Sequence, residues 1–581
     1  MTDYPDLPNI DLLDRIPLDA RVVLDVGCAS GALGAAYRPR NPRCRLLGID
    51  HDREAAQRAA QRLDAVANVD VERNMLPFNP TGGIDCIVYG DVLEHLKDPF
   101  AVLARHAEAL SASGTMLICI PNVEHWSFAA RLLRGDWDYE ESGLLDRTHL
   151  RWFSLESMRR GLDALHLAPC DVHPRVMEPE RAQAFAAAMA PSLQLMGIDP
   201  KAYARRAAPL QYVWRVRRTP PVRMTVAATM LEPIGGVSHT RIVYPLQAMA
   251  TDPAIQTLVV DESDALPSVA PETPRVFVLH RPVLSGAQGV DRLNRLFAAG
   301  WMVVTEFDDH PDFFAAMQGG DQLSFSGVHA VQTSTQALAG ILRGRNPETR
   351  VFPNAIATLP EVRNFAQPFL TLFFGALNRE RDWQPLMPAL NAAAGAAGER
   401  LRFCVVHDRA FFDALDTPHK SFTPTCDHET YLRLLGESEI SFMPLADTGF
   451  NRAKSDLKFI EAGACRAAAL ASPVVYGDSI EDGRTGLLFA GAEELHDRLL
   501  RLVAMPDLAR AIGQAARAYV AERRMLAYQV AERIAWYRSL WDRRMELTAA
   551  LEARVRAVIP AKAGTQADST GFGARGPGFP L

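Results

Sequence analysis

Two carboxylates and a glycine-rich turn near the start of the chain have the spacing of a nucleoside-binding site. The stretch VLDVGCASGALG (residues 23–34) places Asp25, Gly27 and Gly31 where a ligand can approach the backbone closely. Asp50 ends the next apolar run, 23 residues beyond Gly27, where a carboxylate can accept hydrogen bonds from both hydroxyls of a ribose. A dinucleotide loop would need G-x-G-x-x-G, whose first glycine pair is absent. The residues therefore predict a ribose site without a pyrophosphate loop.

An alternation of strand and helix patterns supplies the elements that must position these residues. Short β-branched runs end in Gly, Asp or Pro and alternate with helical stretches such as PFAVLARHAEAL. The runs are RVVLDV, RLLGID, IDCIVYG and TMLICIP, and two more strands around LAPCDVHPRV and LQYVWRVRR close the block. This alternation predicts an α/β domain with a parallel, doubly wound sheet.

The same rhythm recurs in two further blocks. TPPVR (219–223) predicts a linker, because consecutive prolines continue neither a helix nor a central strand. The expected strands of the second block are MTVAATML, TLVVD, VFVLH, WMVVTEFDD and HAVQTST, and those of the third are TLFFGAL, LRFCVVHD, ISFMPL, SPVVYGD and GLLFAG. Helical sequence from 506 to 548 ends the folded part, and residues 549–581 are expected to be a disordered tail.

Composition excludes several classes of protein. Lys and Arg number 62 against 69 Asp and Glu, and the net charge of −7 is too mild to imply a nucleic-acid partner. The eight cysteines are scattered with no C-x-x-C, which favours free thiols in a reducing compartment over structural zinc. The start of the chain has no basic and apolar leader pattern, and no run of about 18 apolar residues occurs. The sequence therefore predicts a soluble cytoplasmic protein.

Four motifs in residues 1–218 resemble a class I S-adenosylmethionine-dependent methyltransferase. They are D-x-G-C-x-x-G combined with Asp50 and with Asp70 ahead of LPF, then FNPTGGIDCIVYGDVLEHLKDP, GTMLICIPNVEHW and RGDWDYEESGLLDRTHLRWFS. The last is similar to methyltransferase domains of bacterial polysaccharide and O-antigen clusters. The resemblance implies a Rossmann-like fold with S-adenosylmethionine as co-substrate. It places Asp25, Gly27 and Gly31 beside the methionine moiety, Asp50 at the ribose and Asp70 at the adenine amino group.

The methyl acceptor is expected near Asp91 and His149. Asp91 follows the fourth strand, and His149 is the candidate general base for a hydroxyl nucleophile, the alternative being a histidine that only fixes the acceptor loop. Asp91, Glu94 and His95 stand at i, i+3 and i+4 and share one face if a helix begins there. Some related methyltransferases hold a divalent metal with E-x-x-E-H, but D/E-x-L-E-H also occurs in metal-free members. The prediction is a site without metal.

Residues 451–489 resemble the nucleotide-sugar-binding region of GT-B glycosyltransferases, particularly the family 4-like group. A helix carrying Glu461 precedes a P-V-V strand and a D-G-R-T-G-L-L loop. The resemblance implies two Rossmann-like halves, residues 224–368 on the acceptor side and 369–548 on the nucleotide-sugar side. It assigns Glu461 to a ribose, Lys454 and Lys458 to the diphosphate, Arg381 or Arg379 to phosphate, and Gly235 and Gly236 to the loop that faces donor and acceptor.

Several alternatives stay open for this half. Family 4 enzymes often show E-x₇-E, but Ala453 occupies the first position, so donor sugar and stereochemistry are open. Asp308 and Asp309 end a strand, either as ligand contacts or as a loop cap, and Lys454 and Lys458 are alternatively solvated charges.

The sequence as a whole predicts a bifunctional fusion in cell-surface polysaccharide or O-antigen assembly. Its partners are a nucleotide sugar, a glycan or lipid-linked glycan acceptor, and membrane-bound assembly proteins at the inner face of the plasma membrane. The alternatives are an active methyltransferase with a non-catalytic GT-B binding module, and a non-enzymatic scaffold.

Overall fold

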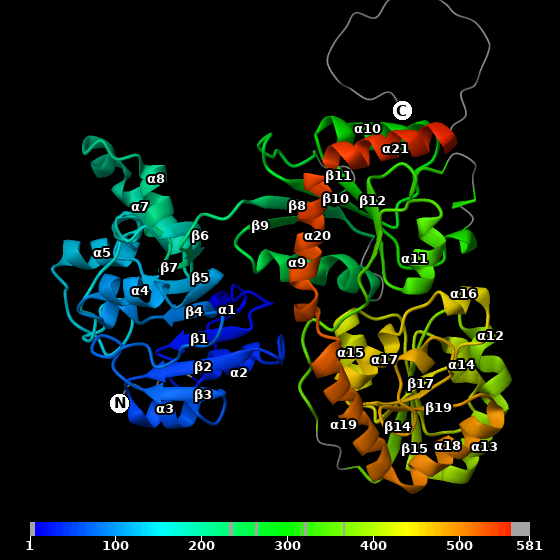
Figure 1. Cartoon of the computed structure of the whole chain (residues 1–581). Helices are drawn as coiled ribbons and strands as arrows, with labels where there is room; N and C mark the ends of the chain where they lie inside the picture. The colour runs from blue at the N-terminus through cyan, green and yellow to red at the C-terminus, as the bar shows by residue number, and fades with distance from the viewer. Residues whose placement is uncertain are drawn as a thin grey trace, which may run out of the picture. The chain divides into compact units, whose positions relative to one another are not determined.

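The computed structural model describes residues 6–231, 236–261, 265–314, 317–318, 322–363 and 367–558, with side chains to residue 556. The chain divides into two compact units (Figure 1). Unit 1 comprises Met1–Arg223 together with the short segment Ala250–Ile255, and unit 2 comprises Met224–Met249 and Gln256–Leu581.

Unit 1 is built on one seven-stranded sheet. Its strands are β1 (Val22–Val26), β2 (Arg45–Asp50), β3 (Ala65–Asn68), β4 (Ile84–Gly90), β5 (Leu110–Pro121), β6 (Ala168–Arg175) and β7 (Gln211–Arg217). They lie in the order β3-β2-β1-β4-β5-β7-β6, parallel up to β5, whereas β7 is antiparallel to both of its neighbours. The predicted parallel sheet with two closing strands is confirmed. β3 was not predicted, because it is a four-residue edge strand with no fully buried residue.

Helices cover both faces of this sheet. They are α1 (Ile10–Leu13), α2 (Ala32–Tyr37), α3 (Arg53–Ala59), the 3-10 helix η1 (Leu93–His95), α4 (Pro99–Ala107), α5 (Trp126–Arg134), α6 (Leu155–Ala164), α7 (Pro179–Leu195) and α8 (Pro200–Ala207). Successive side chains of a strand point to opposite faces, so Leu24 and Ile87 belong to one core cluster, and Val23 and Val88 to the other. Because both faces of the sheet are buried, β1 and β4 are continuous apolar runs. The end of each run marks the end of its strand and so determines where the residues that follow it lie.

Unit 2 contains two six-stranded sheets. The first has β8 (Met224–Thr229), β9 (Ile255–Val259), β10 (Arg275–His280), β11 (Met302–Glu306), β12 (Ala330–Thr333) and β13 (Thr349–Val351), in the order β13-β12-β11-β10-β8-β9. The second has β14 (Leu370–Gly375), β15 (Leu401–Val406), β16 (Lys420–Thr423), β17 (Ile440–Met443), β18 (Ala468–Ala471) and β19 (Gly486–Leu488), in the order β16-β15-β14-β17-β18-β19. The second sheet is parallel throughout, as are the first sheet's pairs from β8 to β13. The predicted α/β class is confirmed.

The helices of unit 2 connect these strands and close the chain. They are α9 (Tyr244–Ala250) after a π-helical turn (His239–Val243), α10 (Gly286–Ala298), α11 (Gln336–Arg343), α12 (Glu380–Trp383), α13 (Met387–Ala397), α14 (Arg409–Ala414), α15 (His428–Gly436), α16 (Gly449–Arg452), α17 (Leu457–Ala464), α18 (Ala492–Ala504), α19 (Pro506–Arg523), α20 (Val530–Asp542) and α21 (Arg544–Val558). Short 3-10 turns occur at Pro311–Phe313, Gln384–Leu386, Gly398–Arg400, Tyr476–Asp478 and Leu526–Tyr528.

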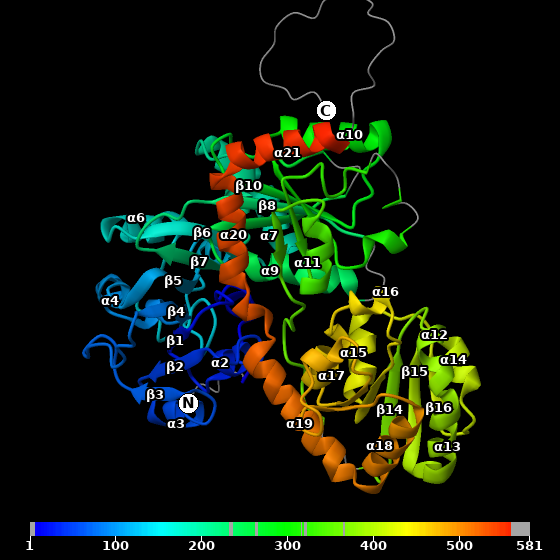
Figure 2. The ribbon, with the colours of Figure 1, turned by 45° about the vertical axis from the view of Figure 1, so that its right-hand side comes forward.

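The last three helices, α19, α20 and α21, pack on elements of both halves of unit 2 (Figures 1 and 2). α19 packs against α17, whereas α20 returns to the first sheet, where the Tyr537 hydroxyl donates to Gln332 Oε1 at 2.8 Å. Leu551 and Val555 of α21 join the core of that sheet. The helical sequence expected to 548 therefore continues to Val558, which corrects the start of the predicted tail (549–581), and the remainder of that tail lies outside the described residues.

The expected strand SPVVYGD is also corrected. The strand that follows α17 is β18, four residues earlier, and the proline-containing stretch forms a turn in which Val475 has φ +70°. β18 lies between β17 and β19, so its backbone N–H groups are needed by the ladders on both sides. Pro473 has no N–H to give, and a central strand excludes it for that reason.

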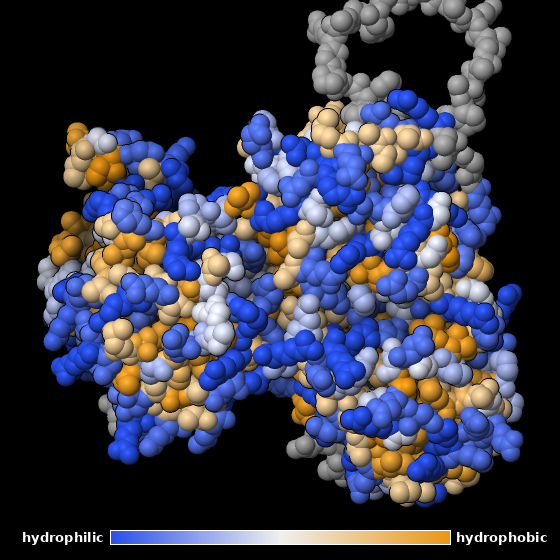
Figure 3. All heavy atoms as spheres, viewed as in Figure 1, coloured by the Kyte–Doolittle hydropathy of each residue, from blue (hydrophilic) through white to orange (hydrophobic). Residues whose placement is uncertain are grey.

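The cysteines and the apolar character of the helices can be compared with the predictions of free thiols and of a chain without a membrane-spanning segment. All eight cysteines are free, seven of them buried and Cys426 partly exposed, which confirms the expectation of free thiols. Among the described residues, no helix has both the length and the apolar character needed to cross a bilayer. On the face shown in Figure 3, hydrophilic residues are interspersed with apolar ones.

Candidate functional site

The glycine turn after β1 is held against the end of β2. The Gly27 N–H donates to the Ile49 carbonyl oxygen at 2.8 Å, and Gly27 and Gly31 have φ of +73° and +77°. A Cβ on Gly27 would lie 2.5 Å from Val92 Cγ2. Glycine is therefore required at position 27 both by backbone conformation and by space.

Asp50 and Asp25 lie beside this turn at the ends of neighbouring strands. Asp50 is 7% exposed, and its carboxylate accepts the N–H of Ala29 at 2.9 Å and that of Asp52 at 2.8 Å. Burial, assisted by the charge of Asp50, raises the pKa of Asp25 to about 7. The structure thus brings Asp25, Gly27 and Asp50 together where the strand order reverses between β1 and β4, the edge at which such sheets bind ligands.

Asp70 follows β3 on the same edge of the sheet. Its side chain accepts the Glu72 N–H at 2.9 Å and pairs with Arg73 at 3.3 Å, and it is partly exposed. β3 is parallel to β2, so Asp50, which ends β2, and Asp70, two residues after β3, lie at the carboxyl ends of adjacent strands. The predicted adenine contact therefore stands next to the predicted ribose contact.

Asp91 follows β4 with φ +56°, on the opposite side of the reversal point. The side-chain amide of Gln211 donates to Asp91 Oδ1, and the Arg175 guanidinium donates in turn to Gln211 Oε1. Burial raises the pKa of Asp91, whereas Arg175 and Gln211 act in the opposite direction. Asp91 is thus linked to β6 and β7.

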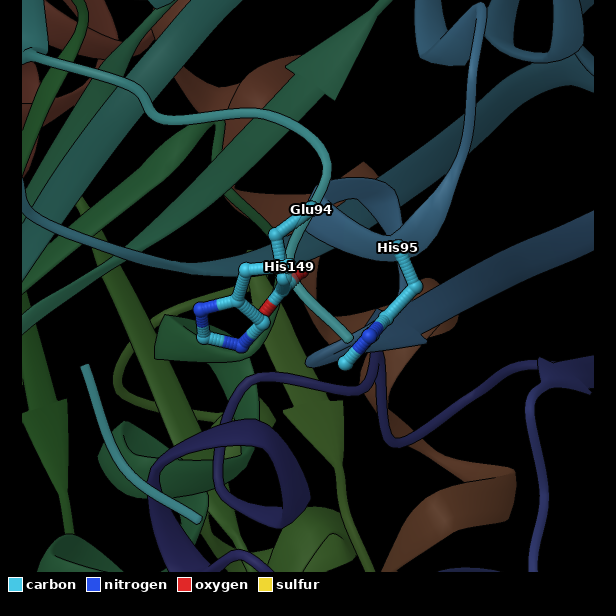
Figure 4. A group of neighbouring side chains, drawn as sticks. All are labelled: Glu94, His95 and His149. Atoms are coloured by element: carbon cyan, nitrogen blue, oxygen red, sulfur yellow. The ribbon is translucent and has the colours of Figure 1, made fainter. Parts of the chain in front are cut away.

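A cluster of Glu94, His95 and His149 lies beyond Asp91 (Figure 4). Glu94 and His95 come from η1, His149 comes from the loop between α5 and α6, and one potential ligand atom of each lies within 4.8 Å of the others. The N–H groups of Leu150 and Arg151 both donate to the Glu94 carbonyl oxygen, at 2.7 and 3.0 Å. These two bonds hold the loop so that His149 meets η1.

The hydrogen bonds of the two imidazoles leave the same nitrogen of each ring available. His149 Nδ1 lies 3.2 Å from the Leu144 carbonyl oxygen, and His95 Nδ1 lies 3.3 Å from that of Thr148 and 3.0 Å from the Thr148 hydroxyl. Carbonyl oxygens only accept, so each Nδ1 carries the proton and each Nε2 the lone pair. Burial lowers the pKa of both histidines, which keeps the rings neutral.

Glu94 has an unusual environment. It is 1% exposed, and neither carboxylate oxygen has a hydrogen-bond partner among the described residues. Burial raises the pKa of Glu94 well above its ordinary value, and Asp91 adds to this. The alternative triad of Asp91, Glu94 and His95 is corrected, because η1 is a 3-10 turn that excludes Asp91, and His149 completes the group instead.

A second cluster lies at the carboxyl end of β14 in unit 2. Lys458 donates to the Gly375 carbonyl oxygen that ends β14, and its Nζ lies 3.3 Å from the Tyr431 hydroxyl. Glu461, one turn further along α17, is 6% exposed. Burial raises the pKa of Glu461 to about 7, whereas Lys458 acts to lower it. The predicted Lys458 and Glu461 are thus brought together at the reversal point between β14 and β17.

The other predicted cations have different surroundings. Lys454 Nζ pairs with Asp309 Oδ1 at 2.7 Å and lies 4.1 Å from the centre of the Phe450 ring. Arg379 donates to Asn451 at 2.8 Å and acts electrostatically on Lys458, whereas Arg381 is exposed in α12. Of the two arginines, Arg379 is therefore the one beside Lys458.

Aromatic and imidazole rings near Glu461 escaped the sequence analysis. A Cβ on Gly236 would lie 2.6 Å from His428 Cε1, and the rings of His428 and His239 stack at 5.5 Å. The hydroxyl of Tyr244 on α9 is close enough to Glu461 for that carboxylate to raise its pKa, although burial is the larger cause. Gly235, also assigned to this loop, lies outside the described residues. The rings come from helical segments that are far apart in the sequence, so no local sequence pattern predicts this cluster.

The architecture defines the class. Unit 1 is a Rossmann-like domain with a candidate nucleoside site, and unit 2 is GT-B-like, with two parallel sheets and closing helices. Residues 6–168 match the family model described as "Methyltransferase domain", and residues 385–535 match the one described as "Glycosyl transferase-like". The chain therefore carries a methyltransferase domain followed by a glycosyltransferase-like domain.

Curated relatives match about a fifth of the chain. The chain is 30% identical over 117 residues to a trans-aconitate 2-methyltransferase of Afipia carboxidovorans, covering 20% of this chain and 44% of the relative. It is 32% identical over 122 residues to an uncharacterized methyltransferase of Mycobacterium bovis (20% and 60%), and 32% over 116 residues to an uncharacterized transposon protein of Streptomyces fradiae (19% and 33%). The chain thus spans between 33% and 60% of the length of these relatives.

Two solved structures are similar to parts of the chain. A SAM-dependent methyltransferase from Archaeoglobus fulgidus is 16% identical with a TM-score of 0.27, covering 36% of this chain and 90% of its own. Sucrose-phosphate synthase from Thermosynechococcus elongatus is 14% identical with a TM-score of 0.40, covering 55% of this chain and 100% of its own.

Proposed function

We propose that the chain is a bifunctional transferase, an S-adenosylmethionine-dependent O-methyltransferase joined to a nucleotide-sugar glycosyltransferase. The observation that carries the first activity is the grouping of Asp25, Gly27, Gly31 and Asp50 at the reversal point of a sheet within the methyltransferase match. Asp50 binds the ribose hydroxyls, Asp70 the adenine amino group, and the glycine turn accommodates the methionine moiety.

Methyl transfer needs alignment more than covalent help from the protein. The acceptor oxygen attacks the sulfonium methyl carbon, the S–CH₃ bond breaks as the O–CH₃ bond forms, S-adenosylhomocysteine leaves, and the hydroxyl proton must go to a base. Holding the two reactants in line contributes up to about 7–11 kcal/mol. The acceptor hydroxyl is activated beside Asp91, at the cluster that contains His149, whose neutral Nε2 has the lone pair a base requires.

The donor site of the second activity is centred on Glu461 and Lys458. Glu461 binds the donor ribose, and Lys458, Lys454 and the neighbouring Arg379 or Arg381 attract the diphosphate. Lys454 exchanges its Asp309 partner for phosphate, and Gly236, with Gly235, lets the donor approach the backbone.

The presence of both domains in one chain supports a shared glycan product. We place the enzyme in the cytoplasm, where free thiols are stable. There it acts on a glycan or lipid-linked glycan with the membrane-bound proteins of polysaccharide or O-antigen assembly.

The decisive experiment measures both activities in the full-length chain. Labelled S-adenosylmethionine binding and methyl transfer are tested with Asp50→Ala, and nucleotide-sugar binding and turnover with Glu461→Gln. Binding of S-adenosylmethionine that survives Asp50→Ala would contradict the pocket assignment, and absence of binding in the unmodified chain would favour the scaffold. Donor binding without turnover across a panel of nucleotide sugars would favour a non-catalytic GT-B module.

A further inference from the structure

The buried carboxyl group of Glu94 has no hydrogen-bond partner among the residues that the structure describes. Both of its oxygens are buried, whereas other side-chain carboxylates of the chain commonly pair with arginine or backbone N–H groups. An unpaired buried carboxyl costs several kcal/mol in general, and such a group in a native fold calls for an explanation. The two imidazoles that face it carry no hydrogen that could serve, because their protons are on Nδ1.

The same hydrogen bonds prepare both histidines as ligands. Metal-binding histidines donate their other N–H to a carbonyl or carboxylate, which fixes the ring and its tautomer. His149 does so to the Leu144 carbonyl oxygen, and His95 to the carbonyl and hydroxyl oxygens of Thr148. The Thr148 hydroxyl donates onward to Asp146 at 2.6 Å, so a carboxylate supports His95 at one remove.

We propose that Glu94, His95 and His149 bind one divalent first-row transition cation, whose open coordination positions take the oxygen of the methyl acceptor. Ligand atoms within 4.8 Å of one another can surround a cation at bond lengths of about 2.0–2.2 Å with small adjustments. Two imidazole nitrogens and one carboxylate suit Zn²⁺, Mn²⁺ or Co²⁺, whereas Ca²⁺ and Mg²⁺ prefer sites made of oxygen alone. Three protein ligands leave room for a fourth group.

The cation site does not depend on the proposed function. The role of the cation in methyl transfer does, because it rests on the proposed methyltransferase activity. A cation at this point polarises the acceptor hydroxyl, so that the proton leaves to solvent before the oxygen attacks the methyl carbon. His149 is then a ligand instead of the general base, and its lone pair is not available for the proton. Removal of the cation therefore distinguishes the two roles of His149.

The test uses the full-length chain after chelation and dialysis, titrated with Zn²⁺ by calorimetry and, for comparison, with Mg²⁺. We expect one Zn²⁺ per chain, a rise in unfolding temperature on loading, and no comparable Mg²⁺ binding. Glu94→Gln preserves the size of the side chain and should weaken Zn²⁺ binding at least tenfold, as should His149→Gln. Thr148→Val, which removes only the hydroxyl beside His95, should weaken it by a smaller factor.

His173→Gln is the matched control, because His173 is a partly exposed histidine of the same unit that pairs with Asp11. Its Zn²⁺ binding should equal that of the unmodified chain. The proposal is overturned if the chelated chain takes up no stoichiometric Zn²⁺, or if Glu94→Gln and His149→Gln, folded by circular dichroism, bind it unchanged. Methyl transfer unaffected by chelation overturns the acceptor role. Stoichiometric binding lost in both variants, without methyl transfer to any acceptor, upholds the site and counts against the proposed function alone.

Discussion

Asp25 and Asp50 share the carboxyl edge of adjacent strands, and the negative charge of Asp50 makes ionisation of the buried Asp25 more costly. Asp50 compensates for its own burial through two backbone N–H groups, one of them in the glycine turn. The turn and the carboxylate of Asp50 therefore depend on each other, while the neighbouring Asp25 has a pKa raised to about 7 by its burial.

Asp50→Ala should weaken S-adenosylmethionine binding about 10- to 100-fold, because hydrogen bonds to a charged group contribute about 1.5–3 kcal/mol. The measurement is calorimetric titration of the full-length chain. Asp52→Ala is the matched control, since Asp52 is exposed and caps α3 through the Ala55 N–H at 2.7 Å. It should lose helix stability and keep its affinity. Equal losses in the two variants would count against the ribose contact.

Asp25→Asn should change how stability depends on pH. Burial raises the pKa of Asp25 from 3.8 to about 7, so the folded chain keeps a proton that the unfolded chain loses above about pH 4. The free energy of unfolding therefore falls as the pH rises from 4 to 7, by up to about 4 kcal/mol from this group. Asp25→Asn has no carboxyl group at this position, so its free energy of unfolding should not show this fall with pH. Thermal unfolding of both proteins at pH 5 and pH 8 checks it, and the same pH response in both would contradict the prediction.

At the scale of elements, the position of Glu461 depends on how closely α19 approaches α17. A Cβ on Gly513 would lie 2.0 Å from the Arg466 carbonyl oxygen, and one on Gly463 would lie 3.0 Å from Val520 Cγ2. Small residues on both helices thus set their separation. Arg524 then pairs with Asp456, the residue before α17, and fixes its start.

Gly513→Ala should destabilise unit 2 by about 1–3 kcal/mol, because α19 must move away from the turn that directly follows α17. Gly395→Ala, at an exposed position in the last turn of α13 with no atom within 4 Å of the added Cβ, should stabilise by about 0.5–1 kcal/mol. Denaturant unfolding followed by circular dichroism measures both changes. If the two substitutions shift the midpoint in the same direction, close packing of α19 on α17 is not what fixes the separation.

The strands and the first site were largely predictable, and the reason is locality. β1, β2, β4 and β5 are apolar runs bounded by turn residues, and Gly27 and Asp50 are recognisable because each lies at the end of such a run. β18 was misplaced because AALA is a poor strand former whose fate is decided by its neighbours β17 and β19. Lys454 and Asp309 are 145 residues apart, so their pairing is a property of the folded chain alone. The same holds for Glu94 and His149.

At the scale of the whole molecule, the two candidate sites belong to separate compact units. Asp50→Ala should slow methyl transfer at limiting S-adenosylmethionine, in line with its weaker binding, while nucleotide-sugar binding stays within about twofold. Glu461→Gln should weaken nucleotide-sugar binding, while S-adenosylmethionine binding stays within about twofold. Independence is expected because each candidate site is made of residues of one unit, and sites without shared partners behave additively. Parallel assays on the two variants provide the measurement, and a loss of both activities in either variant would reveal coupling between the units.

The uneven burial of the thiols has a practical consequence. Seven cysteines are buried, whereas Cys426 is partly exposed, two residues before the helix that carries His428 and Tyr431. A maleimide fluorophore should therefore attach at one position without any cysteine being replaced. Because that position adjoins the proposed donor site, the natural sequence already contains an attachment point for a fluorophore that would report nucleotide-sugar binding.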